Sequence, residues 1–210
     1  MRRLLELFSG TGSVGRVFRE AGWEVVSVDI ESKFNPTLCM SVLDIKLDRW
    51  PPKHFDVIHA SPPCCEYSVA HTGNARNLEK GDMLAIYALN LIDVLQPRFW
   101  ILENPQSGKL KTRPFMQALQ YADAAYCMYS DWGYRKRTRF WNNIPGLQLK
   151  DCHGDCPNMT LSVHGHMVHR TSAQKGPSHG STTDRNFTFV ELYRIPPALV
   201  EAILAAIVAA

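Results

Sequence analysis

Two adjacent cysteines, Cys64 and Cys65, directly follow a pair of prolines at positions 62 and 63. Consecutive prolines fix φ and remove two backbone donors, so this loop is stiff and cannot extend a sheet ladder. A stiff loop holds the next side chain in a set direction, which suits a nucleophilic thiol. Taken alone, the pair reads equally well as two small apolar side chains at the edge of a core, because free cysteines are often buried.

Other chemically useful side chains also follow apolar runs. Asp29 follows residues 23–28, the cysteine loop follows residues 55–60, and Glu103 follows residues 98–102. We predict strands for these runs, and open α/β sheets bind ligands at the carboxyl ends of their strands. Asp29 could then accept both hydroxyls of a ribose. Glu103 must be paired, have a raised pKa, or simply reach water at the strand end.

A glycine-rich turn lies between a predicted buried strand at residues 4–8 and a predicted helix at residues 14–21. Gly10, Gly12 and Gly15 have the spacing G-x-G-x-x-G, which lets a ligand approach the backbone at a helix N-terminus. The spacing is weak evidence alone. Together with Asp29 it predicts a nucleoside-containing ligand, and it does not say which one.

Two further groups each allow two interpretations. Asp44, in a short apolar run, could contact an adenine amino group or could be a solvated loop aspartate. In a strand, Arg135, Arg137 and Arg139 would share one face. A row of guanidinium groups suits phosphate, carboxylate or base acceptors, but it also suits an exposed edge strand protected by charge.

The elements that must position these groups predict an α/β fold with a mostly parallel, doubly wound sheet. We expect further helices at residues 83–95, around 114–121 and at 198–208, and strands at 124–129 and 135–141. The chain has 210 residues and a formal net charge of +3, which is too small to indicate a nucleic-acid-binding protein by itself.

Six cysteines without an apolar leader predict a reducing, cytoplasmic compartment. The apolar run at residues 198–210 is interrupted by Glu201, so we expect a buried helix rather than a membrane span.

Residues 147–186 are polar, irregular and rich in histidine. Cys152 and Cys156, followed by His164, His166 and His169, could hold a zinc ion. Without a second ligand pair of firm spacing we assign no metal, and the other interpretation is a polar insertion that binds nothing.

Taken in order, these stretches resemble the cytosine carbon-5 DNA methyltransferases over about residues 4–141 and, weakly, 192–204. The similarity rests on five motifs in family order. Residues 7–12 look like the F-x-G-x-G cofactor loop, 62–68 are similar to P-P-C-Q-x-F-S, 96–105 look like the strand with E-N-V, and 135–139 resemble Q-x-R-x-R, while Asp29 and Asp44 look like the ribose and adenine acids.

The resemblance implies a Rossmann-like fold that binds S-adenosylmethionine and methylates a flipped-out cytosine. Cys64 would add to carbon 6 of the base, its pKa lowered by nearby arginines and the helix field, while Glu103 would hold ring nitrogen 3. Arg137 would contact the base carbonyl and hold Glu103. The implied catalytic residues are Cys64, Glu103, Arg137 and Arg139, and the implied cofactor-binding residues are Phe8, Ser9, Gly10, Thr11, Gly12, Asp29, Ile30, Asp44 and Pro62.

The chain departs from the family pattern at several positions. Pro105 replaces the valine of E-N-V, and Arg135 replaces the glutamine of Q-x-R-x-R. Cys65, whose role stays open, occupies the position of the glutamine in P-P-C-Q-x-F-S. The final motif, normally G-N-S-V before prolines, is here residues 192–197. The recognition region is also short, so we expect a catalytic domain at 1–145, a reduced recognition segment at 146–190 and a C-terminal helical segment at 191–210.

The favoured function is methylation of carbon 5 of cytosine in duplex or single-stranded DNA, with no membrane and no required protein partner. The alternatives are the same chemistry on RNA or a free cytidine nucleotide, or a catalytically silent, cofactor-binding protein associated with nucleic acid. A nicotinamide enzyme would explain the glycine spacing but not the cysteine and glutamate loops.

Overall fold

The computed structural model describes residues 1–69, 76–171 and 187–210 and has a central seven-stranded sheet. Its strand order is β3-β2-β1-β4-β5-β7-β6, and six of these strands run in one direction while β7 runs in the opposite one. The strands are β1 (Arg3–Leu7), β2 (Glu24–Asp29), β3 (Leu38–Cys39), β4 (Val57–Ala60), β5 (Phe99–Pro105), β6 (Tyr121–Ala125) and β7 (Arg137–Asn142).

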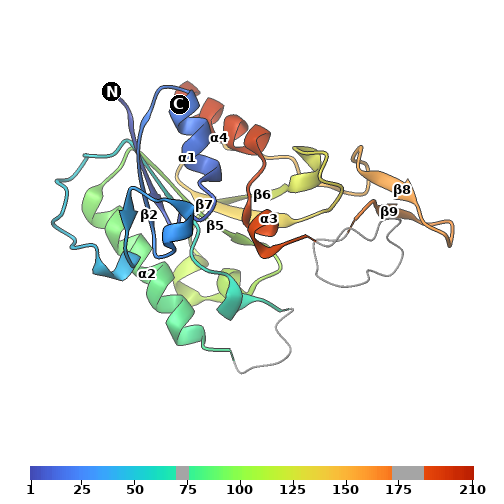
Figure 1. Ribbon diagram of the computed structural model, residues 1–210, viewed down its shortest axis with the longest axis horizontal. Coiled ribbons are helices and arrows are strands. Elements are labelled where there is room, and N and C mark those ends of the chain that lie inside the picture. The colour runs from blue at the N-terminus through green and yellow to red at the C-terminus, as the bar shows by residue number, and fades with distance from the viewer. Residues whose placement is uncertain (70–75, 172–186) are drawn as a thin grey trace.

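Helices cover both faces of this sheet (Figure 1). On one face, α1 (Ser13–Glu20) and α4 (Pro197–Ala209) bury apolar side chains such as Phe18 and Leu199. On the other face, α2 (Leu78–Leu95) packs over residues such as Ile58 and Leu102. Because the central strands are buried on both faces, they read as continuous apolar runs in the sequence. The predicted Rossmann-like fold, doubly wound and mostly parallel, is confirmed.

The C-terminal region contains the short helix α3 (Phe189–Tyr193) followed by α4. The stretch Val190–Ala209 is long and apolar enough to cross a membrane by length and composition, but such a stretch is weak evidence because core helices pass the same test. Ile203 and Ile207 of α4 are buried in the core shared with α1. As predicted from residues 198–208, α4 packs back on the sheet.

Three predicted elements differ from the structure. The helix expected around 114–121 is a 3-10 turn, Pro114–Met116, and Tyr121 already pairs with β7. The strand expected at 124–129 ends at Ala125, where a 3-10 turn, Tyr126–Met128, begins. Helix α2 starts before residue 83, because the Asn77 side chain accepts a hydrogen bond from Lys80 N at 2.9 Å and caps an earlier first turn.

The segment predicted as irregular contains a small antiparallel hairpin, β8 (Met159–Leu161) and β9 (Met167–His169). The hairpin extends beyond the β6 side of the sheet (Figure 1). The predicted recognition segment at 146–190 also includes residues 172–186, which lie outside the described residues, and its boundaries stay a prediction.

Candidate active site at the carboxyl edge of the sheet

The strand ends that carry the predicted residues meet at one edge of the sheet. Strands β1, β2, β4 and β5 are parallel neighbours, so the glycine turn, Asp29, the cysteine loop and Glu103 follow adjacent carboxyl ends. Strand β7 is antiparallel to β5, so its first residues, and Lys136 before them, reach the same edge. The fold therefore gathers residues from distant parts of the sequence, as a ligand site in an open α/β sheet requires.

The turn after β1 has an unusual backbone. Phe8, Gly10 and Gly12 have φ values of 57°, 46° and 66°, in the left-handed region. A Cβ atom built on Gly10 or Gly12 would have no described atom within 4 Å. The two glycines therefore supply the backbone conformation and leave open space in front of the turn.

Asp29 holds this turn in place. Its carboxylate accepts hydrogen bonds from Gly10 N at 2.7 Å and from Glu31 N at 2.8 Å. Each carboxylate oxygen has a second lone pair, so Asp29 can still accept a hydroxyl from a ligand. The neighbouring Ile30 is 70% exposed, a large fraction for an apolar side chain beside this edge. Asp44, at the end of a 3-10 turn, is also exposed.

Glu6 is a buried acid under the same turn, and sequence reasoning missed it. Its Oε2 would lie 2.4 Å from a Cβ on Gly15, so the glycine lets α1 pack directly on the carboxyl group. Burial raises the pKa of Glu6 to about 7, and the N–H groups of Gly15 and Val14 oppose this effect. Its position between two apolar neighbours in β1 was the available signal.

Hydrogen bonds hold the cysteine loop on both sides. Asn104, which is buried, donates from Nδ2 to Pro62 O at 2.8 Å. Beyond the cysteines, the buried Tyr67 donates from Oη to Asp82 Oδ1 at 3.1 Å. Asp82 is also bound by Arg113, whose Nε lies 2.9 Å from Oδ2. The loop is therefore fixed to β5 and to α2, in agreement with the stiffness expected from its prolines.

The Cys64 thiol is half-buried, whereas Cys65 is exposed. Burial raises the pKa of Cys64, the nearby Lys136 lowers it, and Glu103 and Cys65 raise it further. The expected lowering of this pKa by arginines is therefore wrong. The cation that favours the thiolate is Lys136, and its effect is smaller than that of burial.

Glu103 lies close enough to Cys64 for its charge to act on the thiol. Its side chain is 7% exposed, and burial raises its pKa, while Lys136 and a hydrogen bond with Ser61 oppose the shift. Lys136 Nζ lies 4.9 Å from the centroid of the Tyr126 ring and donates to Leu192 O at 2.8 Å. Lys136 thus links the thiol and the carboxyl to the region of the altered final motif.

The structure does not bring Arg137 or Arg139 to Glu103. In the register of β5 and β7, Glu103 is opposite Phe140, so the two arginines point to the other face of the sheet. Arg139 pairs with Asp123 at 2.8 Å, and Arg137 pairs with Asp151. The predicted support of Glu103 by Arg137 is corrected accordingly, because strand alternation places Lys136 on the Glu103 side.

Two tyrosines near the thiol were also missed. Tyr126 is fully buried, which is the main reason that its pKa is raised, and Glu103 and Cys64 both act on that pKa. Tyr193, in α3, is close enough for Cys64 and Cys65 to act on its pKa, and burial is the main reason that this pKa is raised. Nothing in the local sequence of either residue indicates this position.

Comparison with known proteins agrees with this geometry. Residues 2–120 match the family model of the C-5 cytosine-specific DNA methylases. The chain belongs to this family. A Frog virus 3 (isolate Goorha) protein named probable DNA (cytosine-5)-methyltransferase is 36% identical over 220 aligned residues, which cover 96% of this chain and 98% of the viral protein.

Solved methyltransferase structures share the fold of this C-5 cytosine methylase. A prophage-encoded candidate DNA modification methyltransferase of E. coli has a TM-score of 0.51 at 18% identity and covers 68% of this chain. A mutant of Spodoptera frugiperda DNMT2 gives 0.50 at 15% and covers 72% of this chain, and S. pombe Dnmt2 gives 0.51 at 14% and covers 71%. The matches cover 46%, 56% and 52% of those longer chains, respectively.

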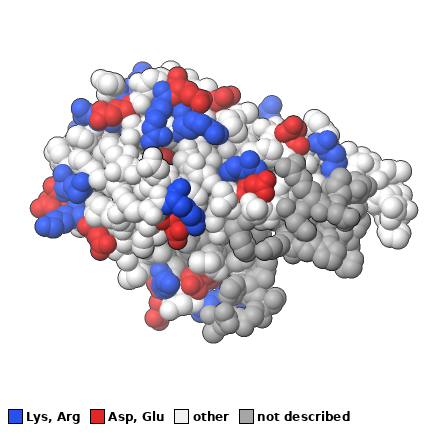
Figure 2. Space-filling view, in the orientation of Figure 1, with Lys and Arg blue, Asp and Glu red and all other residues white. Residues whose placement is uncertain are grey.

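The surface charge of this methylase is mixed on the face that Figure 2 shows. Lys and Arg side chains lie in small scattered groups, several of them beside Asp and Glu, so the described residues form no single basic surface on this face. On this face, the charge pattern alone does not mark where a nucleic acid would bind.

Proposed function

We propose that this protein transfers a methyl group from S-adenosylmethionine to carbon 5 of cytosine in DNA, through a covalent adduct between Cys64 and carbon 6. Membership of the C-5 cytosine-specific DNA methylase family supports the reaction. The observation that carries the residue assignment is the position of the Cys64 thiol beside the buried Glu103 carboxyl and Lys136, at the same sheet edge as the glycine turn.

The turn after β1 and the tip of β2 fit S-adenosylmethionine. The open space at Gly10 and Gly12 would admit the cofactor, and the spare lone pairs of Asp29 would accept ribose hydroxyls. The exposed Ile30 would cover the adenine ring, and the Asp44 carboxylate would accept a hydrogen bond from the adenine amino group. Phe8, Ser9 and Thr11 complete the turn, and the buried Pro62 starts the neighbouring loop. When bound, the cofactor supplies an electrophilic methyl group.

The residues of the site prepare the cytosine ring for attack on that methyl group. The Cys64 thiolate forms a bond to carbon 6, and the electrons of the ring double bond move to carbon 5. Burial keeps Glu103 protonated over a wider pH range than a surface carboxyl, so Glu103 can donate its proton to ring nitrogen 3 as negative charge develops. After methyl transfer, loss of the carbon-5 proton returns electrons to the ring and expels Cys64.

The target base must leave a DNA duplex or come from a single strand, because the stacked base hides carbons 5 and 6. We place this reaction in a reducing, cytoplasmic compartment, since all six cysteines are free thiols. Recognition of the DNA would fall to the segment at 146–190, which follows the residues matched by the family model.

A substrate screen with matched cysteine variants tests the proposal. Labelled S-adenosylmethionine is incubated with duplex DNA, single-stranded DNA, transfer RNA or dCMP, and we expect label at carbon 5 of cytosine in DNA. Cys64→Ser should lower the rate by about 10³-fold or more, whereas Cys65→Ser should retain it within a few-fold. Label only in RNA or dCMP would overturn the DNA assignment, and a 5-fluorocytosine adduct that survives in Cys64→Ser would overturn the nucleophile.

A further inference from the structure

Three cysteines and one histidine form a cluster outside the candidate active site. Cys127, Cys152, Cys156 and His169 each offer one ligand atom, and these four atoms all lie within 4.8 Å of one another. The Nε2 atom of His169 is 3.5 Å from the sulfur of Cys152 and 3.3 Å from that of Cys156. All three cysteines are buried free thiols, so the cluster is not a disulfide.

The two S···N distances are close to the corresponding edges of a tetrahedral zinc site. With Zn–S bonds of about 2.3 Å and Zn–N bonds of about 2.0–2.1 Å, a tetrahedron has S···N edges of roughly 3.6 Å and S···S edges of roughly 3.8 Å. A Cys₃His set is one of the usual donor sets of structural zinc. The four ligands come from three separate parts of the chain, and the fold alone brings them together.

We propose that Cys127, Cys152, Cys156 and His169 bind a structural Zn²⁺ ion. Four protein ligands fill the tetrahedral sphere and leave no position for a substrate, so the metal would support the structure and would not take part in methyl transfer. On binding, the three thiols release their protons and the imidazole stays neutral, so the zinc centre carries a net charge of −1.

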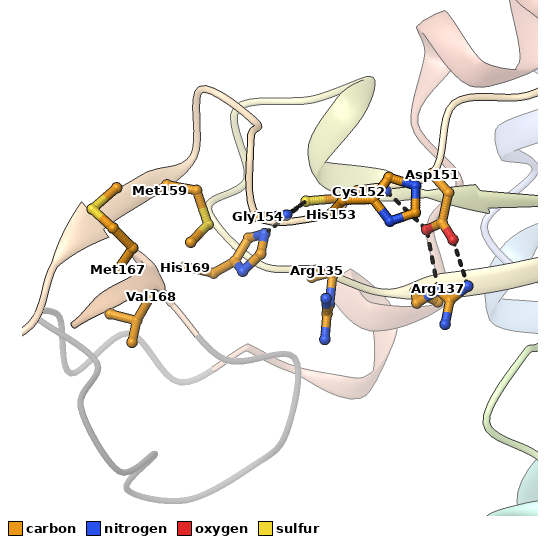
Figure 3. A pocket seen from close by; sticks show the side chains of 10 residues that line it. All are labelled: Arg135, Arg137, Asp151, Cys152, His153, Gly154, Met159, Met167, Val168 and His169. Carbon is orange, nitrogen blue, oxygen red and sulfur yellow. Dashed lines mark hydrogen bonds and ion pairs between the residues drawn. The ribbon is translucent and has the colours of Figure 1, made fainter.

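The surroundings of the cluster suit such a charge. Figure 3 shows His169 directed toward the sulfur of Cys152, with Arg135 and the Arg137–Asp151 pair beside them. These residues line a cavity of about 530 Å³, which gives a metal ion a path to the site. The Arg137–Asp151 pair has no net charge, so Arg135 supplies positive charge beside the thiolate-rich centre.

Hydrogen bonds around the ligands fix their positions without a metal. Gly154 N donates to the Cys152 sulfur at 3.4 Å, and the φ of +91° at Gly154 turns the backbone around that sulfur. Asp151 Oδ1 accepts from Cys152 N at 2.8 Å and from Arg137 Nε at 3.1 Å. Partners of this kind orient metal ligands in established sites.

The buried side chain of Asn158 fixes the backbone at Cys127. Its Nδ2 donates to Cys127 O at 2.8 Å, which ties the loop after Cys156 to the 3-10 turn that carries Cys127. Hydrogen bonds within the loop at 150–156, from Arg137 of β7 and to the turn after β6 therefore hold the cluster in place.

A metal here would replace a hydrophobic core that the region lacks. The hairpin β8–β9 has three residues in each strand, and such hairpins are marginal on their own. The apolar cluster beneath it consists of Ala125 and the three cysteines, with Met128 and Met159 packed against it. A zinc ion would join the end of β6, the loop at 150–156 and β9 in one unit, as metals do in small domains.

Metal analysis of the intact purified protein tests this inference. We expect about one zinc ion per chain and little iron. Cys156→Ala and His169→Ala should lose at least about nine-tenths of the zinc, because each removes one of four ligands. The matched controls are His164→Ala, an exposed histidine of the same hairpin, and Cys39→Ser, an exposed cysteine elsewhere, and both should keep the full zinc content.

A second measurement does not depend on the folding of any variant. Wild-type protein, reduced and stripped with a chelator, is titrated with Co²⁺, and we expect the absorption bands of tetrahedral cobalt with thiolate ligands, lost on addition of one equivalent of Zn²⁺. Absence of these bands together with absence of zinc in the purified protein would overturn the inference. A Cys127–Cys152 or Cys152–Cys156 disulfide in protein purified without reductant, or full zinc content in Cys156→Ala, would do the same.

Discussion

At the scale of single residues, the proposed nucleophile Cys64 would have to ionise where burial raises its pKa. Lys136 is the cation that opposes this effect of burial. Replacing Lys136 with glutamine should therefore raise the pKa further, because a nearby positive charge that favours the thiolate is lost. The measurement is the pH dependence of iodoacetamide alkylation at Cys64, in a Cys65→Ser background, and its midpoint should move to higher pH in Lys136→Gln.

Lys136→Arg is the matched variant for this prediction. It keeps the positive charge and changes the shape of the head group, so its midpoint should stay close to that of the parent. An unchanged midpoint in Lys136→Gln would show that Lys136 does not act on the thiol. The pH at which methyl transfer reaches half its maximal rate should also shift, in the same direction as the midpoint of alkylation.

Glu6 gives a second residue-scale prediction, on stability. Its folded pKa of about 7 lies above its unfolded value of 4.5, so the folded state binds more protons between these pH values. Stability from this group is therefore full below pH 4.5 and is lost as the pH rises through 7. Glu6→Gln cannot ionise, so its free energy of unfolding should exceed that of wild type at pH 8, by up to roughly 3 kcal/mol, and match it at pH 4.5.

Urea unfolding of both proteins at pH 4.5 and 8 checks this expectation. The comparison between variants removes the contribution of the buried His59, whose pKa is lowered to about 4 by burial and which titrates in both proteins alike. An equal difference in stability at the two pH values would contradict the assignment of the raised pKa to Glu6.

Residues inside motifs could be predicted from the sequence, and residues outside them could not. Asp29 and Glu103 directly follow apolar runs, and Cys64 follows one after a short proline loop, so the predicted strands indicate where these side chains lie. Cys127 follows a strand that was placed wrongly, and it lies 25 positions before Cys152, a separation without the regular spacing of a metal motif. Contacts made in the folded chain bring that sulfur to the loop at 150–156, among them Ala125 N donating to Lys150 O at 3.0 Å and Asn158 Nδ2 donating to Cys127 O at 2.8 Å.

At the scale of elements, β7 shows how strand alternation decides roles. Arg137 and Arg139 share a face, as predicted, but Arg135 lies before the strand, and the shared face points away from Glu103. Arg139 and Asp123 are largely buried, with side-chain exposures of 13% and 18%. Arg139→Ala should leave an unpaired buried carboxylate and lower the free energy of unfolding by about 2–4 kcal/mol, while the folded enzyme keeps its methylation rate within a few-fold.

Asp123→Asn is the control for this pair, since it breaks the same interaction from the other strand. A structural role predicts similar losses of stability and similarly retained rates in both variants. A rate that falls by about 10³-fold in Arg139→Ala but not in Asp123→Asn would instead assign Arg139 to the reaction, as the family resemblance implied. Urea unfolding and single-turnover methylation separate the two results.

Element types were predictable where an apolar run was continuous, as in β1, β4 and β5. The helix expected around 114–121 is wrong, because the chain forms only the 3-10 turn Pro114–Met116 there before β6 begins. The alanines of β6 carry weak strand preference, and their strand forms through pairing with β7. Such tertiary pairing is invisible in a local pattern.

At the scale of the whole molecule, the proposed cofactor, catalytic and zinc sites follow one another along one edge of the sheet. The cofactor turn lies at β1 and β2, the thiol and carboxyl follow β4 and β5, and the proposed zinc cluster follows β6 at the far end. Figure 1 shows this order, with β2 on one side and the hairpin β8–β9 on the other. Damage at the zinc end should therefore spare cofactor binding.

Zinc removal tests this division. After chelation, amide hydrogen exchange should rise at residues 150–171, which the metal would join, and stay unchanged in β1, β4 and β5, whose protection comes from the packed sheet. Affinity for S-adenosylmethionine should change by less than about twofold, because Asp29 and the glycine turn do not contact the cluster. Affinity for DNA should fall by about tenfold or more, since the proposed recognition segment loses its anchor.

Loss of protection throughout the sheet would show instead that the metal supports the entire fold. Re-addition of Zn²⁺ is the control, and it should reverse every change that chelation causes.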